Sequence, residues 1–253
     1  SNGSKLTVAD ASYSTDSLKV ESGSTLVNKD GTISSSSTIT VSGGTVQGSG
    51  TFSAITLNSG KLVVGNSPGL QVFTGDLILG NGEMEFSVAG FENMATVGVT
   101  GWDSSVYSCV DMNGHNLSFR ADSEAAFTLA FGGNALEELK SAKDSTPLSF
   151  SITLIQNVKS FSEDMLADML DKTRLMITTE SAGLPSWAAG LAGMYITQYA
   201  NNLEYTLEAG NTEGTYNVVL SGSFGLTEVV PEPTTATLSL LALAALAMRR
   251  RRK

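Results

Sequence analysis

Residues 48–79 read GSGTFSAITLNSGKLVVGNSPGLQVFTGDLIL and determine the fold of the N-terminal part of the chain. Apolar residues alternate with polar ones in short runs, for example Ile55 and Leu57, then Leu62 and Val64. This period of two is typical of a β-strand with one buried face. Gly, Asn, Ser and Asp separate the runs and favour turns. Strands this short cannot bury a core alone, so we expect them to stack in coils.

The same pattern extends in both directions, from Lys5 to Gly90. The alternating apolar pairs are Leu6/Val8, Leu18/Val20, Ile39/Val41, Ile55/Leu57, Leu62/Val64, Leu70/Val72 and Leu77/Leu79. We predict an all-β fold in which these strands stack in parallel as a β-helix, or β-solenoid, over residues 1–93. On the pattern alone, an antiparallel sandwich built from hairpins remains open.

Three motifs within residues 48–79 favour the β-helix. They are Gly48-Ser49-Gly50-Thr51-Phe52, Gly65-Asn66-Ser67-Pro68-Gly69 and Gly75-Asp76-Leu77-Ile78-Leu79. In this order they resemble the autotransporter-associated β-strand repeat. The resemblance implies a right-handed parallel β-helix, a shape frequent in adhesins and surface stalks.

In residues 94–228 helix-like segments appear among the strand-like ones. We interpret this region as terminal coils with helical insertions and a mixed strand and helix cap. Helices are predicted at residues 134–144, with Asn134 as N-cap and Glu137 in a capping box, and at residues 160–171, with Ser160 and Glu163 in the same roles. An apolar stripe on the second helix should pack on a sheet, although a methionine-rich stripe is also suited to partner binding. Its members are Phe161, Met165, Leu166 and Met169.

Strands are expected around these helices, and the region should end in a hairpin across residues 209–214. The single strands are Ala126–Phe131, Pro147–Gln156 and Arg174–Thr178, and the hairpin strands are Leu203–Glu208 and Thr215–Leu220.

Residues 236–248 are uninterrupted by charge and rich in Leu and Ala, which are strong helix formers. Counted from Thr234, such a helix rises roughly 22 Å at about 1.5 Å per residue, which is short against a hydrocarbon core of about 30 Å. We predict a short transmembrane helix. The basic cluster that follows should stay on the cytoplasmic side and fix the orientation. Its residues are Arg249, Arg250, Arg251, Arg252 and Lys253.

Pro231, Glu232 and Pro233 stand just before this segment. Each proline restricts its own φ and biases its predecessor toward extended backbone, so the tripeptide forms a stiff handle outside the membrane. With the helix and basic cluster, residues 229–253 resemble the PEP-CTERM sorting domain of Gram-negative bacteria. The resemblance implies recognition by an exosortase, a membrane-embedded cysteine transpeptidase, with cleavage near the tripeptide and transfer to the cell surface or matrix. These residues would then be substrate rather than catalyst.

The charge distribution argues against nucleic acid as a partner. The net charge is −10, from 15 basic and 25 acidic residues. Without the five basic residues at the end, 10 remain against 25 acidic ones, a balance of −15. Phosphate binding requires clustered Lys and Arg, whereas an acidic body keeps an exported protein soluble.

Few residues offer chemistry. The single cysteine, Cys109, allows neither an intrachain disulfide nor a cysteine zinc site, and we expect it to be buried. His115 follows the turn signal of Asn113 and Gly114. Glycosidases need two carboxylates about 5–10 Å apart. The candidate pairs are Asp103 with Asp111 and Glu83 with Glu85.

No nucleophile elbow, phosphate loop or dinucleotide motif is present in the sequence. We therefore predict no catalytic, cofactor-binding or metal-binding residues. The function expected is that of an exported surface or matrix protein, held transiently in the inner membrane, with a stalk or adhesin role and glycans as candidate ligands. The alternative is the C-terminal fragment of a surface polysaccharide lyase or glycosidase. Because the chain begins Ser1-Asn2-Gly3-Ser4 with no initiator Met, we expect a fragment or processed chain with further sequence upstream.

Overall fold

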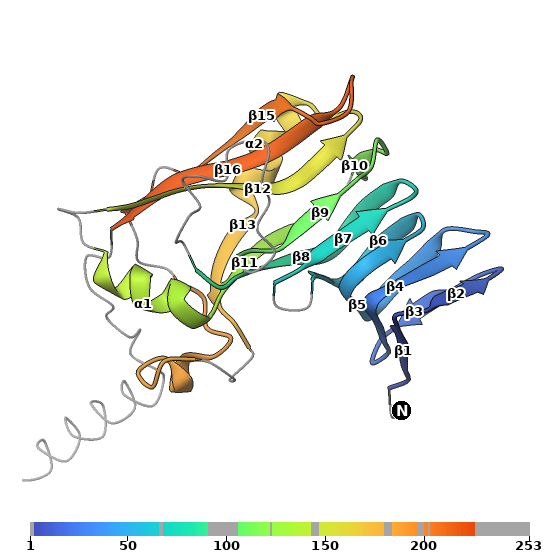
Figure 1. Ribbon diagram of the computed structural model, residues 1–253, viewed down its shortest axis with the longest axis horizontal. Helices are drawn as coiled ribbons and strands as arrows, with labels where there is room; N and C mark the ends of the chain where they lie inside the picture. The colour runs from blue at the N-terminus through green and yellow to red at the C-terminus, as the bar shows by residue number, and fades with distance from the viewer. Residues whose placement is uncertain are drawn as a thin grey trace, which may run out of the picture.

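The computed structural model describes residues 3–65, 68–90, 106–121, 123–142, 147–179, 184–196, 200–201 and 203–225. Within these ranges the chain is mostly β with few helices. One open, curled sheet joins the strands (Figure 1). The strands are β1 Lys5–Ala9, β2 Ser12–Thr15, β3 Lys19–Glu21, β4 Thr25–Ser35, β5 Ile39–Phe52, β6 Ile55–Val64, β7 Leu70–Phe73, β8 Leu77–Val88, β9 Cys109–Asp111, β10 Leu117–Phe119, β11 Ala126–Phe131, β12 Leu148–Val158, β13 Thr173–Ile177, β14 Ala200–Asn201, β15 Glu204–Ala209 and β16 Tyr216–Gly225.

The strand registers form three parallel columns. The first runs from β1 through parts of β4, β5, β6 and β8 to β11 and β13. The second runs from β2 through β4, β5, β7 and β9 to β12. The third joins β3, β5, β6, β8 and β10. We call one passage of the chain through the three columns a coil.

The predicted parallel stacking of residues 5–90 is confirmed where the structure describes them. Every ladder among β1 to β8 is parallel, and the antiparallel contact recorded there is one isolated bridge between Gly48 and Gly65. The hairpin alternative for this stretch is therefore wrong.

A continuous apolar core fills the stack, because equivalent inward residues lie in register from coil to coil. Val41 pairs with Leu57, which pairs with Leu79, and all three are fully buried. Phe52 and Phe73 stack with ring centroids 6.1 Å apart. Burial of each such side chain is worth about 1.5–3 kcal/mol, so the coils stabilise one another where single strands would not.

One predicted apolar pair faces the wrong way. Leu70 and Val72 are half-buried, whereas Gln71 and Phe73 point into the core. The inward phase is set by the stack, because Phe73 lies in register with Phe52 and packs on it. The Gln71 amide is accommodated because its Nε2 donates to the Val63 carbonyl at 2.9 Å.

The turn between the first and second columns is braced by a buried side chain, Asn28. Its Nδ2 donates to the carbonyls of Gly31 and Thr51, each at 3.1 Å, and its Oδ1 accepts from the Gly31 amide at 3.0 Å. In the next coil Gly48 has a φ of 110°, and a Cβ there would lie 1.8 Å from the Asn28 carbonyl oxygen. Glycine is thus required at this turn by both conformation and space.

The two helices exist, but their predicted N-caps are wrong. Helix α1 spans Gly133–Ser141 and begins after Gly132, with no side-chain cap. The chain enters it directly from β11, and Gly133 has a φ of 50°, so backbone geometry replaces the expected Asn134 capping box. Helix α2 spans Glu163–Asp171 and is capped by Ser162, whose Oγ accepts from Met165 N at 3.3 Å.

The apolar stripe of α2 packs inward, as expected of a stripe that covers a sheet. Leu166 and Met169 are buried, and the preceding Phe161 packs against the same core. Its ring meets Phe119 edge-on at 6.4 Å. The binding-face alternative for this stripe is not supported by its burial.

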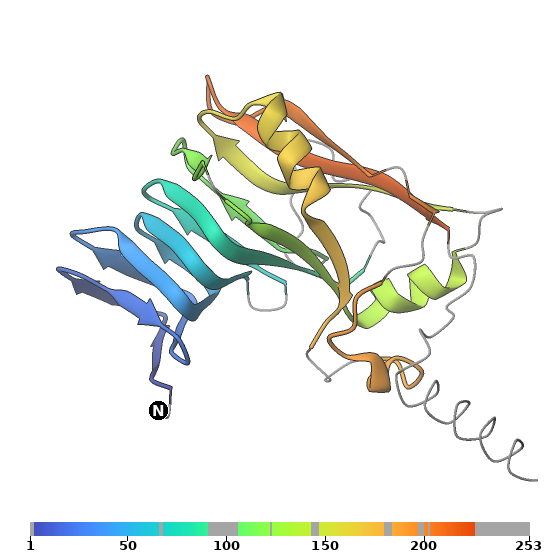
Figure 2. The same ribbon diagram turned by 180° about the vertical axis from the view of Figure 1, so that it is seen from behind.

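The C-terminal strands agree closely with the sequence prediction. β11 has the predicted bounds, β12 and β13 are shifted by one or two residues, and β15 and β16 form the predicted antiparallel hairpin. β16 also pairs antiparallel with β12 and β14. These strands and α2 lie at the end of the stack opposite β1–β3 (Figures 1 and 2). Within the described ranges, no helix has the length and apolar character needed to cross a membrane, and the predicted segment at 236–248 lies outside those ranges.

Candidate functional site

The predicted sorting residues lie outside the described ranges. They are Pro231, Glu232 and Pro233, with Arg249, Arg250, Arg251, Arg252 and Lys253. The structure therefore bears on the body of the protein, where the sequence offered carboxylates, one histidine and one cysteine as candidates.

Glu83 and Glu85 do share one face of β8, as predicted, but both contact a lysine. β6 and β8 are in register so that Lys61 lies opposite Glu83. The Lys61 Nζ is 2.5 Å from Glu85 Oε2 and 3.6 Å from Glu83 Oε1. Burial on its own would lower the pKa of Lys61, but the hydrogen bond and charge of Glu85, with those of Glu83, raise the pKa above its usual value.

This arrangement ties two coils together. A glycosidase needs one carboxyl that can hold a proton and a second that reaches the substrate, whereas Glu85 is 8% exposed and ion-paired. Sequence reasoning missed Lys61. The sequence does place Lys61 at an outward position of the preceding strand, which is a signal for an ion pair with Glu83 and Glu85. The alignment of β6 with β8 that brings these residues together could not be predicted, because the lengths of the coils were unknown.

Replacing Lys61 with Met should lower the free energy of unfolding by about 1–3 kcal/mol, because Glu85 would stay buried without its cation. Glu83→Gln is the matched control, since this partner is more distant and 27% exposed, and it should cost less than about 0.5 kcal/mol. Urea unfolding monitored by circular dichroism measures both variants. Equal losses would contradict the assignment of Glu85 as the principal partner.

The same pair predicts an alkaline dependence. The folded-state pKa of Lys61 is raised above its unfolded-state pKa of about 10.5. The contribution of the charged lysine to the free energy of unfolding is therefore complete below about pH 10.5, and it is lost as the pH rises through the folded-state pKa. The stability difference between wild type and Lys61→Met should therefore shrink only above about pH 10.5.

Asp111 is a structural acceptor rather than a free acid. Its Oδ1 accepts from the Asn113 amide at 2.8 Å and from Asn157 Nδ2 at 3.1 Å, and its Oδ2 accepts from Gln156 Nε2 at 3.0 Å. These bonds join β9 to β12 and hold the turn that follows β9. The other member of the candidate pair, Asp103, lies outside the described residues.

His115 follows the predicted tight turn, in which Asn113 and Gly114 have φ values of 47° and 81°. Its Nδ1 lies 4.0 Å from Asp76 Oδ1. That oxygen already accepts from both the amide and the Nδ2 of Asn116, at 2.9 and 3.2 Å. The nearby Ser160 Oγ donates to Asn116 Oδ1 at 2.9 Å, so His115 and this hydroxyl are not arranged as base and nucleophile.

Cys109 is buried and free, as predicted. Burial raises the pKa of its thiol well above the usual range, and the Asp111 charge adds to the rise. A protonated, enclosed thiol is a poor nucleophile. Among the described residues, no three His, Cys, Asp or Glu side chains come together in a way that would hold a metal ion.

Among the comparisons with known proteins, one family model matches the chain, and the match lies in the C-terminal tail. Residues 229–253 match the family model of the PEP-CTERM protein-sorting motif. No curated protein matches the chain. No solved structure matches it either. The matched residues contain both the proline tripeptide and the basic cluster. The chain thus carries the PEP-CTERM protein-sorting motif that its tail predicts, which marks it as an exported, cell-surface-directed protein sorted by an exosortase.

Proposed function

We propose that this protein is a non-catalytic surface stalk or adhesin, whose stacked strands form a parallel β-helix and whose tail is removed by an exosortase. The observation that carries the proposal is the PEP-CTERM motif at residues 229–253, at the end of a body made of parallel stacked strands. An exported chain of this kind extends from the cell without needing an active site.

The β-helix assignment is supported by the three parallel columns and by the core that continues from coil to coil. The motifs that resemble the autotransporter-associated repeat fall on β5 to β8. A stack in which each coil contacts only its neighbours gives length at a low contact order, which suits a spacer.

The tail gives the proposed route. The helix at 236–248 would hold the exported chain in the inner membrane, with the arginine cluster inside and the acidic body outside. Cleavage near Pro231, Glu232 and Pro233 would then release the body to the surface or matrix.

The non-catalytic role is supported by the contacts of the candidate carboxylates. Glu83 and Glu85 form ion pairs with Lys61, and the Asp111 carboxylate accepts three hydrogen bonds. In contrast, exposed Ser and Thr side chains on the coils, for example Ser12, Thr32 and Ser42, offer hydroxyls for contact with extracellular polysaccharide. Turnover of a polysaccharide panel that is lost in Glu85→Gln or Asp111→Asn would overturn this part of the proposal.

Exosortase dependence tests the proposal directly. In a host with the enzyme, the protein should appear at the surface or in the medium. In the same host with the exosortase gene deleted, we expect it to fractionate with the inner membrane, because the apolar tail is retained. Identical fractionation in the two hosts would contradict the proposed sorting.

A further inference from the structure

The end of β16 is held in the sheet from both sides. On one edge Phe224 pairs with Leu148 of β12. On the other edge Gly225 pairs with Ala200 of β14, and nearer its start β16 pairs with β15. Gly225 is therefore a fixed point of the folded body.

A strand that is paired on both edges is costly to unravel. Each residue freed from the end of β16 breaks pairing with β12 and with β14 or β15. Further in, Val218 and Leu220 are fully buried, and exposure of each such side chain costs about 1.5–3 kcal/mol. The reach of the chain beyond Gly225 is therefore not easily lengthened at the expense of this strand.

The sorting motif follows this fixed point closely in the sequence. Five residues, 226–230, separate Gly225 from Pro231. Because a fully extended chain spans at most about 3.6 Å per residue, Pro231 is within about 22 Å of Gly225. The apolar segment at 236–248 begins eleven residues after Gly225, within about 40 Å of it. When that segment lies in the membrane, the end of the body at Gly225 is held close to the membrane surface.

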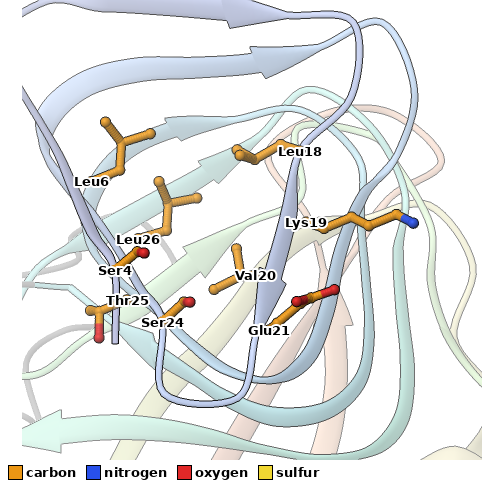
Figure 3. Close-up of a pocket in the computed structure, with 9 residues that line it drawn as sticks. All are labelled: Ser4, Leu6, Leu18, Lys19, Val20, Glu21, Ser24, Thr25 and Leu26. Carbon is orange, nitrogen blue, oxygen red and sulfur yellow. The ribbon is translucent and has the colours of Figure 1, made fainter. Parts of the chain in front are cut away.

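The end of the body that is held there consists of the last residues of β16 and the first residues of β12 and β14. It lies on the side of the molecule where α1 lies, and the β15–β16 hairpin lies on the opposite side (Figures 1 and 2). The first coils are elsewhere in the stack. They contain a cavity of about 220 Å³ between β1 and β3, lined in part by Leu6, Val20 and Leu26 (Figure 3), and the columns separate them from Gly225.

This end of the body carries no charge along its strands, although the protein is acidic. Residues 147–151, 200–201 and 221–225 contain no Asp, Glu, Lys or Arg, whereas the chain before the basic cluster has a balance of −15. Like charges repel at short range, so an acidic face would resist approach to anionic lipid headgroups. The uncharged end is the part of the body best suited to approach an enzyme embedded in the membrane.

We propose that residues 226–230 are a spacer of near-minimal length, and that the exosortase cuts the chain while this uncharged end of the folded body lies against the enzyme. The inference rests on the proposed sorting by an exosortase. In this arrangement the body takes part in presenting the tripeptide. Gly225 fixes the point from which the chain must reach the active site, and the spacer supplies the reach.

The test is deletion of residues 226–228 from the full chain, in a host that contains the exosortase. These residues lie before the matched motif at 229–253. The deletion shortens the reach from Gly225 to Pro231 to about 11 Å, so the folded body should obstruct the enzyme. We expect release to fall about tenfold or more, because small misplacements of a reacting group have effects of this size. The matched control keeps the length and changes the sequence, and it should be released like wild type. It combines Leu226→Gly, Thr227→Ser and Glu228→Gly.

Immunoblots of the membrane and released fractions measure the effect, and limited proteolysis shows that the body is folded in each variant. Release of the deletion variant at the wild-type level would overturn the inference. Retention of the substituted control would also overturn it, because the sequence of the spacer would then matter rather than its length. Wild type that is released equally without the exosortase gene would instead contradict the proposed function.

A second measurement does not depend on the deletion. A photoreactive amino acid placed at Ser149, which is exposed at the start of β12, should cross-link the precursor to the exosortase. The same amino acid at Lys19, which is exposed in the first coils, should not. Cross-links of equal yield from the two positions, or from neither, would contradict contact through the end of the body at Gly225.

Discussion

Replacement of Pro231, Glu232 and Pro233 by three alanines should leave the protein in a heavier, membrane-associated form. The change removes the stiff, extended segment that the processing enzyme would read, but it keeps the apolar segment at 236–248 and the basic cluster. Moving an Arg to the centre of a membrane helix costs about 2.5–3.5 kcal/mol on insertion scales. The basic cluster would therefore stay on the cytoplasmic side and keep the chain across the membrane. Export should proceed, and release should be lost almost completely.

Fractionation and immunoblotting measure this effect. The control is Thr234→Ala with Thr235→Ala, which alters the two neighbouring residues and leaves the proline tripeptide intact. The control should be released like wild type. If the triple-alanine variant is released as efficiently as the control, the tripeptide is not the recognition element.

The second large effect is expected in the body, at Asn28. Asn28→Ala removes three hydrogen bonds, to both backbone groups of Gly31 and to the Thr51 carbonyl of the next coil. The site is buried, and each partner left unsatisfied costs about 1–3 kcal/mol. We expect the free energy of unfolding to fall by about 3–5 kcal/mol, which is enough to loosen the N-terminal coils.

Asn58→Ala is the matched control for this substitution. Its Nδ2 makes one long, exposed bond of 3.4 Å to Ser42 Oγ, so the loss should be below about 0.5 kcal/mol. Urea unfolding of both variants gives the comparison. Similar midpoints for Asn28→Ala and wild type would show that the turn does not depend on this side chain.

The parallel stack was predictable from sequence because alternation of apolar residues directly reports which face of a strand is buried. The features that the sequence did not predict depend on contacts between residues that are far apart in the chain. Successive first-column positions Thr25, Thr45, Lys61 and Glu83 are separated by 20, 16 and 22 residues. Because this spacing is irregular, neither the Lys61 ion pairs nor the inward phase of Gln71 and Phe73 could be read from a fixed period.

The helix caps failed for a similar reason. Ser160 and Ser162 are both suitable N-caps by residue type. The structure uses Ser162, while the hydroxyl of Ser160 bonds Asn116, 44 residues earlier in the chain. The Asn134 capping box failed because the chain turns into α1 through Gly132 and Gly133. At both helices a suitable capping residue was present in the sequence, but contacts with distant parts of the chain determined where the helix begins.

Removal of the tail by an exosortase can be measured by peptide mass spectrometry of the C-terminus of the mature surface protein. We expect peptides that end near Pro231, Glu232 and Pro233, and none that contains the basic cluster at 249–253. A mature surface protein that still carries Arg249 to Lys253 would contradict it, because the apolar segment would then be a permanent anchor and not a sorting signal.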